Sequence, residues 1–86
     1  MNKVLVVDDE EAILKGIRLN LGRIFDITIA NGPQDAFRLF KEEGPFEVVV
    51  SDMRMPEMDG ATMLRKIKEE NPEVMTILLT GHADFE

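Results

Sequence analysis

The chain has 86 residues, contains no cysteine, and carries a formal net charge of −7 from 10 Lys+Arg against 17 Asp+Glu. These values exclude a disulfide framework, a thiolate zinc site and a cysteine nucleophile. The acidic balance argues against direct binding of nucleic acid, whose phosphate backbone requires a basic face. No apolar run approaches the ~20 residues that cross a bilayer, and the first residues lack a signal-peptide pattern. We therefore expect one small cytoplasmic domain over residues 1–86 with no membrane contact.

The first part of the chain predicts a strand, a helix and a second strand. Lys3–Val7 is a continuous apolar run, typical of a buried parallel strand, and Asp8 and Asp9 end it. A segment with apolar residues at helix spacing follows and stops at Gly22. In residues 25–30 apolar and polar side chains alternate, which predicts a strand at a sheet edge with one face exposed.

The middle of the chain predicts a helix, a strand and a loop. Pro33 suits the first turn of a second helix, and Gly44 ends it. Phe46–Ser51 has the character of the first strand and stops at Asp52. The following segment, Met53–Gly60, contains a proline and a glycine and is therefore predicted to be a loop.

The last part predicts a third helix, which begins at Gly60 and ends at Asn71, and a fourth strand over Val74–Leu79. Strands that alternate with helices over short connections predict a parallel sheet with helices on its faces. The predicted fold class is therefore α/β with four strands and three helices. If the fourth strand is the last, Val74, Ile77 and Leu79 should expose apolar surface at an open edge.

Oxygen-bearing side chains follow three of the four predicted strands. Asp8 and Asp9 follow the first strand, Asp52 the third and Thr80 the fourth. Because the carboxyl ends of parallel strands meet at one edge, we expect these groups to lie together. A small set of hard oxygen donors favours Mg2+. Capping of the next helix is an alternative for Asp8 and Asp9, and for Thr80 it is compatible with a phosphoryl contact.

Three segments carry a family resemblance: Val4–Glu10, Val50–Gly60 and Ile77–Gly81. The second is the most specific, because an Asp that ends a hydrophobic strand is followed by Met-Pro and Met-Asp-Gly. In these segments the chain resembles the receiver domain of two-component response regulators, and the match runs along the whole sequence. The resemblance implies a flavodoxin-like receiver fold and a role in signal transduction.

The resemblance also implies roles for individual residues. Asp52 would be the phosphoacceptor, taking a phosphoryl group from a histidine kinase or phosphotransfer protein. Asp9, Asp52 and the backbone carbonyl of Arg54 would hold Mg2+, with Asp8 assisting directly or through a water. The hydroxyl of Thr80 would bond a phosphoryl oxygen and act as the switch. The chain would then be a phosphoacceptor protein that at most sheds its own phosphoryl group, and not an enzyme with turnover.

The family fold has five βα units, whereas this sequence ends after the fourth strand. The family's fifth strand supplies a lysine that contacts the phosphoryl group, and no lysine follows Thr80 here. We therefore expect an incomplete receiver with impaired phosphorylation, and self-association through the exposed edge of the fourth strand.

Two alternatives differ in function class. One is an assembly fragment that folds and self-associates without being phosphorylated. The other is a Mg2+-dependent phosphatase of the haloacid-dehalogenase type, which also has an Asp nucleophile after a strand. That class requires a second Asp two residues after the nucleophile, where this chain has Arg54.

Overall fold

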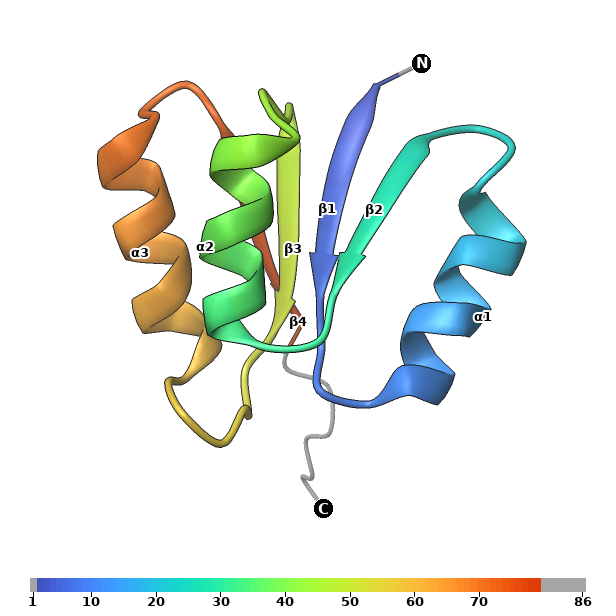
Figure 1. Cartoon of the computed structure of the whole chain (residues 1–86), viewed down its shortest axis with the longest axis horizontal. Helices are drawn as coiled ribbons and strands as arrows, with labels where there is room; N and C mark the ends of the chain where they lie inside the picture. Colours follow the sequence, from blue (N-terminus) through green and yellow to red (C-terminus); the bar gives the residue numbers. More distant parts are fainter. Residues whose placement is uncertain (1, 80–86) are drawn as a thin grey trace.

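The computed structural model of the chain describes residues 2–79 as three layers, with a parallel sheet between α1 on one face and α2 and α3 on the other (Figure 1). The elements are β1 (Lys3–Val7), α1 (Glu11–Leu21), β2 (Asp26–Ala30), α2 (Pro33–Glu42), β3 (Val48–Asp52), α3 (Gly60–Glu70) and β4 (Met75–Leu79). This order agrees with the prediction element by element. The predicted switch residue, Thr80, lies outside the described residues.

The four strands lie in the order β2-β1-β3-β4, and every neighbouring pair is parallel. β1 is therefore an interior strand, with Val6 opposite Ile29 on one side and Val50 on the other. Val4–Val7 are all buried, which explains why the run is continuously apolar and not alternating. With all strands parallel, their carboxyl ends lie at the same edge of the sheet.

Each face of the sheet has its own apolar core. On one face Leu5 and Val49 pack with the buried residues of α3, among them Met63 and Ile67. On the opposite face Val4, Val6 and Ile27 pack with Leu14 of α1. Two helices thus cover one face and a single helix covers the other, as Figure 1 shows.

β2 forms one edge of the sheet, as predicted, but the expectation of an exposed face is wrong at its end. Asp26 is exposed, Thr28 is half-buried, and Ala30 is fully buried. Ala30 belongs to the same core cluster as Ala36 of α2, which lies over this face. The alternating pattern predicted an exposed face because Thr28 and Ala30 are residue types that also occur on solvent-facing positions. Their burial depends on α2, which covers this face.

β4 pairs with β3 alone among the described strands, and no fifth strand occurs within residues 2–79. Met75, Ile77 and Leu79 are 59%, 41% and 42% exposed, all on one face of the strand. The expectation of exposed apolar surface is thus confirmed for Ile77 and Leu79. It is wrong for Val74, which precedes β4 and is 1% exposed in the core beside Ile67.

The lengths of the helices can be compared with the thickness of a bilayer. In the described part of the chain, none is long and apolar enough to span a bilayer. α1, α2 and α3 have 11, 10 and 11 residues, about half of what a bilayer requires.

Candidate functional site

The sheet brings together three carboxylates that are far apart in the sequence. Asp8 and Asp9 follow β1, and Asp52 is the last residue of the neighbouring strand β3. One carboxylate oxygen of each lies within 4.8 Å of the others. The predicted cluster is therefore present, at the carboxyl edge where open α/β sheets bind ligands.

The three carboxylates differ in their access to water. Asp8 is 4% exposed, Asp52 is half-buried and Asp9 is exposed. The arrangement therefore has a dry side at Asp8 and an open side at Asp9. A ligand would approach from the open side, where Asp9 is exposed and Asp52 is half-buried.

Burial raises the pKa of the Asp8 carboxyl above its ordinary value, because a charged carboxylate loses hydration there. The nearby negative charges of Asp52 and Asp9 add to the rise. A hydrogen bond of 3.0 Å from the backbone N–H of Glu10 to Oδ1 of Asp8 acts in the opposite direction. The site thus stores electrostatic repulsion, which a cation would relieve.

The alternative that these acidic residues simply cap α1 is not borne out. The N-cap residue of α1 is Glu10, and it makes no side-chain capping hydrogen bond. Asp8 does accept the N–H of Glu10, but that group lies before the first turn of the helix. Asp8 and Asp9 are therefore free of the cap position, and the capping role does not compete with a metal role.

The loop between β3 and α3 is closed at its base. The backbone N–H of Gly60 donates to the carbonyl of Met53 at 2.8 Å. Met55 turns inward and is buried in the core, whereas Arg54 and Pro56 are exposed. The peptide of Arg54, two residues after Asp52, is thus held between a buried residue and a fixed loop end.

The far end of this loop is held by a helix cap. Oδ1 of Asp59 accepts the backbone N–H of Thr62 at 2.8 Å. This hydrogen bond lowers the pKa of the Asp59 carboxyl, because it favours the charged form. Asp59 therefore fixes the start of α3 and is a structural residue of the loop.

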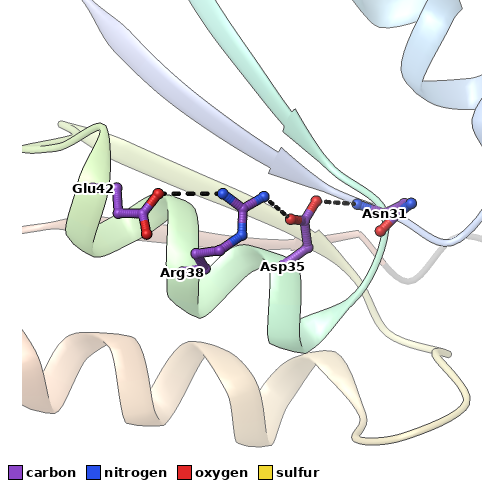
Figure 2. Close-up of polar contacts among 4 residues, drawn as sticks. All are labelled: Asn31, Asp35, Arg38 and Glu42. Carbon is purple, nitrogen blue, oxygen red and sulfur yellow. Dashed lines mark hydrogen bonds and ion pairs between the residues drawn. The ribbon is translucent and has the colours of Figure 1, made fainter.

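An open hollow of about 530 Å³ adjoins Asp9 and is bordered by the β2–α2 connection and Glu57. Asn31, Asp35 and Arg38 line it, and Figure 2 shows the contacts among them and from Arg38 to Glu42. Arg38 pairs with Asp35 and, at 3.3 Å, with Glu42. Asp35 also accepts the backbone N–H of Asn31 at 3.4 Å. The hydrogen bond between Asn31 and Asp35 ties the first turn of α2 to the residue that follows β2, so this wall of the site is ordered by contacts of its own.

The donor set fits a hard divalent cation. Within residues 2–79, the cluster of Asp8, Asp9 and Asp52 is the acidic group whose geometry could hold a metal ion. All its donors are oxygens, and one carboxylate is exposed enough to admit a hydrated ion. Mg2+ prefers a few carboxylates and retains several waters, which is the arrangement this edge offers.

Three residues at this edge make contacts that the sequence analysis did not predict. Ser51 is fully buried next to Asp52, Gly60 lies against the Asp52 backbone, and Asp59 caps α3. An Asp just before a helical pattern is a recognised N-terminal signal and could have revealed the cap. Nothing in the sequence distinguishes Ser51 from any other serine near the end of a strand.

The comparisons with known proteins all point to one family. Residues 4–86 match the response regulator receiver domain. The regulatory protein AtoC of Escherichia coli is 33% identical over 87 residues, a match that covers 100% of this chain and 19% of AtoC. The sensor kinase CckA of Brucella abortus is 36% identical over 83 residues, covering 94% of this chain and 9% of CckA. The chain thus spans a small part of each of these relatives.

Solved structures agree with the sequence matches. A response regulator receiver domain protein from Clostridium thermocellum superimposes with a TM-score of 0.89 at 36% identity, covering 98% of this chain and 68% of that one. The BeF3-activated DrrB receiver domain gives a TM-score of 0.82 at 36% identity, covering 98% and 69%. Fold, acidic edge and sequence agree, and the chain belongs to the response regulator receiver domain family of two-component signalling.

Proposed function

We propose that this chain accepts a phosphoryl group on Asp52 from the phosphohistidine of a histidine kinase or phosphotransfer protein. The observation that carries the proposal is the cluster at the carboxyl edge of the sheet. There the half-buried carboxylate of Asp52 lies with those of Asp8 and Asp9, with oxygens within 4.8 Å of one another. A carboxylate so placed at a strand end is accessible and held by a rigid sheet, as a nucleophile requires.

The transfer replaces one phosphorus bond by another. A carboxylate oxygen of Asp52 forms a bond to phosphorus while the bond between phosphorus and the donor's ring nitrogen breaks. The nitrogen keeps the electron pair of that bond, and the product on Asp52 is an acyl phosphate. Later attack by water on phosphorus releases inorganic phosphate and restores the carboxylate, so the chain acts as a phosphoacceptor and not as an enzyme with its own substrate turnover.

The proposed metal is Mg2+, held by Asp9, Asp52 and the backbone carbonyl of Arg54, with Asp8 assisting directly or through a water. When bound, the ion supplies positive charge that offsets the phosphoryl oxygens and the clustered carboxylates. The hydroxyl of Thr80 is the proposed phosphoryl contact and switch, and it lies outside the described residues.

The test is phosphorylation by acetyl phosphate, followed by intact mass. We expect the chain to gain one phosphoryl group when Mg2+ is present and none after chelation by EDTA. Asp52→Asn should gain none, because the amide is not a nucleophile. Asp26→Asn is the matched control, since Asp26 is an exposed aspartate that begins a strand at the other end of the sheet. Equal labelling of Asp52→Asn and the unaltered chain would show that Asp52 is not the acceptor.

A second candidate function is self-association through β4. It is favoured by the exposure of Met75, Ile77 and Leu79 on a strand that pairs on one side only within residues 2–79. A strand with an unpaired edge and an apolar face is a template for pairing with a second chain. We expect light scattering after size exclusion to give a dimer with and without Mg2+, and Ile77→Lys to give a monomer. Leu19→Lys is the control, because Leu19 is 82% exposed on α1, away from β4. A monomer at high concentration of the unaltered chain refutes this candidate.

A further inference from the structure

Ser51 is a buried polar residue whose hydroxyl bonds the main chain of the next residue. It precedes Asp52 in β3, and it is 0% exposed. Its Oγ donates to the backbone carbonyl of Asp52 at 2.8 Å. A buried hydroxyl requires a partner, and this one is satisfied at the residue that bears the proposed acceptor carboxylate. The contact therefore concerns the main chain of Asp52.

The Asp52 carbonyl is also confined from the side of α3. Gly60 is the first residue of α3. A Cβ atom at Gly60 would lie 2.1 Å from the Asp52 carbonyl oxygen and 2.8 Å from Oγ of Ser51. The hydroxyl, the carbonyl and the first residue of α3 are thus in mutual contact, and the carbonyl has little room to rotate.

The same contacts reach the loop that follows. The N–H of Gly60 donates to the carbonyl of Met53 at 2.8 Å, which fixes the peptide between Met53 and Arg54. The N–H of Met53 donates to the carbonyl of Leu79 at 3.2 Å. This N–H and the Asp52 carbonyl belong to one planar peptide, so that peptide is held through its N–H by β4 and through its oxygen by the hydroxyl of Ser51.

We propose that Ser51 is a positioning residue for the phosphoacceptor. The carbonyl and the carboxylate of Asp52 are attached to the same Cα, so a hydroxyl that holds the carbonyl also fixes the direction in which the side chain leaves the strand. Ser51 acts through Asp52 and has no contact with the phosphoryl group. The inference rests on the proposed function, and it assigns this buried hydroxyl to the alignment of the nucleophile.

The test compares Ser51→Ala with Val49→Ala. Val49 is also 0% exposed and lies two residues earlier in β3, on the same face as Ser51. Val49→Ala removes more buried volume and should lower the unfolding free energy further, whereas Ser51→Ala removes one hydroxyl. Because a misplacement of about 1 Å in a reacting group can lower a rate about 100-fold, we expect Ser51→Ala to lower the saturating phosphorylation rate with acetyl phosphate about tenfold. The half-saturating donor concentration should not change, and Val49→Ala, measured below its melting temperature, should keep the original rate.

A second measurement does not depend on phosphorylation. Mg2+ titration followed by the amide resonances of Met53 and Gly60 should give an affinity about three- to tenfold weaker in Ser51→Ala than in the unaltered chain or Val49→Ala. Ser51→Thr keeps the hydroxyl and should restore both the affinity and the rate.

The outcomes distinguish the proposed phosphorylation of Asp52 from the proposed positioning role of Ser51. If rate and Mg2+ affinity in Ser51→Ala equal those of the unaltered chain, or if both follow stability with Val49→Ala slowest, the positioning role is refuted. If the unaltered chain is not phosphorylated at all, the proposed function fails. In that case the Mg2+ titration still decides whether Ser51 orders the acidic edge.

Discussion

We expect Gly60→Ala to remove most of the stability of the fold. The added Cβ would lie 2.1 Å from the Asp52 carbonyl oxygen and 2.9 Å from Cδ1 of Leu78. The side chain of Leu78 can move, but the carbonyl belongs to an interior strand, so α3 would have to shift away from the sheet. Overpacking against backbone costs about 3 kcal/mol or more. A small domain has only about 0.05 to 0.15 kcal/mol of stability per residue.

The measurement is urea unfolding followed by far-UV circular dichroism, with Gly16→Ala as the control. Gly16 lies inside α1, and a Cβ there would meet nothing within 4 Å. Gly16→Ala should therefore raise the unfolding free energy by about 0.5 to 1 kcal/mol, the ordinary gain for alanine in a helix. Opposite signs at the two glycines are the expected result. A stable Gly60→Ala variant would contradict the close approach of α3 to Asp52.

Asp8→Asn should stabilise the chain and weaken its affinity for Mg2+. The substitution removes a charge that is 4% exposed and repelled by Asp9 and Asp52. Asparagine keeps the oxygen that accepts the N–H of Glu10. We expect the unfolding free energy at neutral pH without Mg2+ to rise by about 1 to 2 kcal/mol. Mg2+ affinity, measured by calorimetric titration, should fall about tenfold or more.

Asp9→Asn separates the two effects. Asp9 is exposed, so its replacement should weaken Mg2+ binding by a similar factor while adding less stability than Asp8→Asn. If Asp8→Asn destabilises the chain instead, repulsion among the three carboxylates does not lower the stability of the fold.

The pH dependence of stability gives an independent check on Asp8. Its pKa is raised in the folded state, mainly by burial, so the folded state binds the proton more tightly than the unfolded state. The cost of burying the charge is absent below the ordinary pKa of an aspartate and grows as the pH rises through the raised folded value. Without Mg2+, this contribution should therefore lower stability with rising pH in the unaltered chain and be absent from Asp8→Asn.

Much of the fold follows from strand patterns that burial explains. β1 was predicted over the residues it occupies, because an interior parallel strand has both faces covered and therefore reads as a continuous apolar run. β3 begins at Val48, two residues later than predicted, although Phe46 is buried. A buried apolar residue just before a strand is easily predicted to belong to the strand. Apolar residues in a sequence indicate which side chains are buried, but they do not indicate where main-chain pairing begins.

The acidic edge was predictable for a topological reason. Once β1 and β3 are parallel, the residues that end them must share an edge, whatever their separation in the chain. The prediction therefore needed only the element order to place Asp8, Asp9 and Asp52 at one edge, and the direct pairing of β1 with β3 makes them neighbours.

The contacts that hold the acidic edge in place were not predictable from any sequence pattern. The approach of Gly60 to the Asp52 carbonyl depends on the distance between α3 and the sheet, and the Ser51 hydrogen bond depends on a side-chain rotation. The burial of Val74 likewise results from the path of the chain between α3 and β4, where its N–H donates to the carbonyl of Asn71 at 3.1 Å. These are tertiary distances, and neither periodicity nor composition specifies them.

The strand order has a consequence for synthesis on the ribosome. β1, the first strand made, lies inside the sheet, with β2 on one side and β3 on the other, and β4 is added beside β3. Each of the strands within residues 2–79 can therefore join a free edge as it emerges, and none of these has to insert between two strands already paired. The sheet can grow outward in the order of translation, and the acidic edge is complete once residue 52 has emerged.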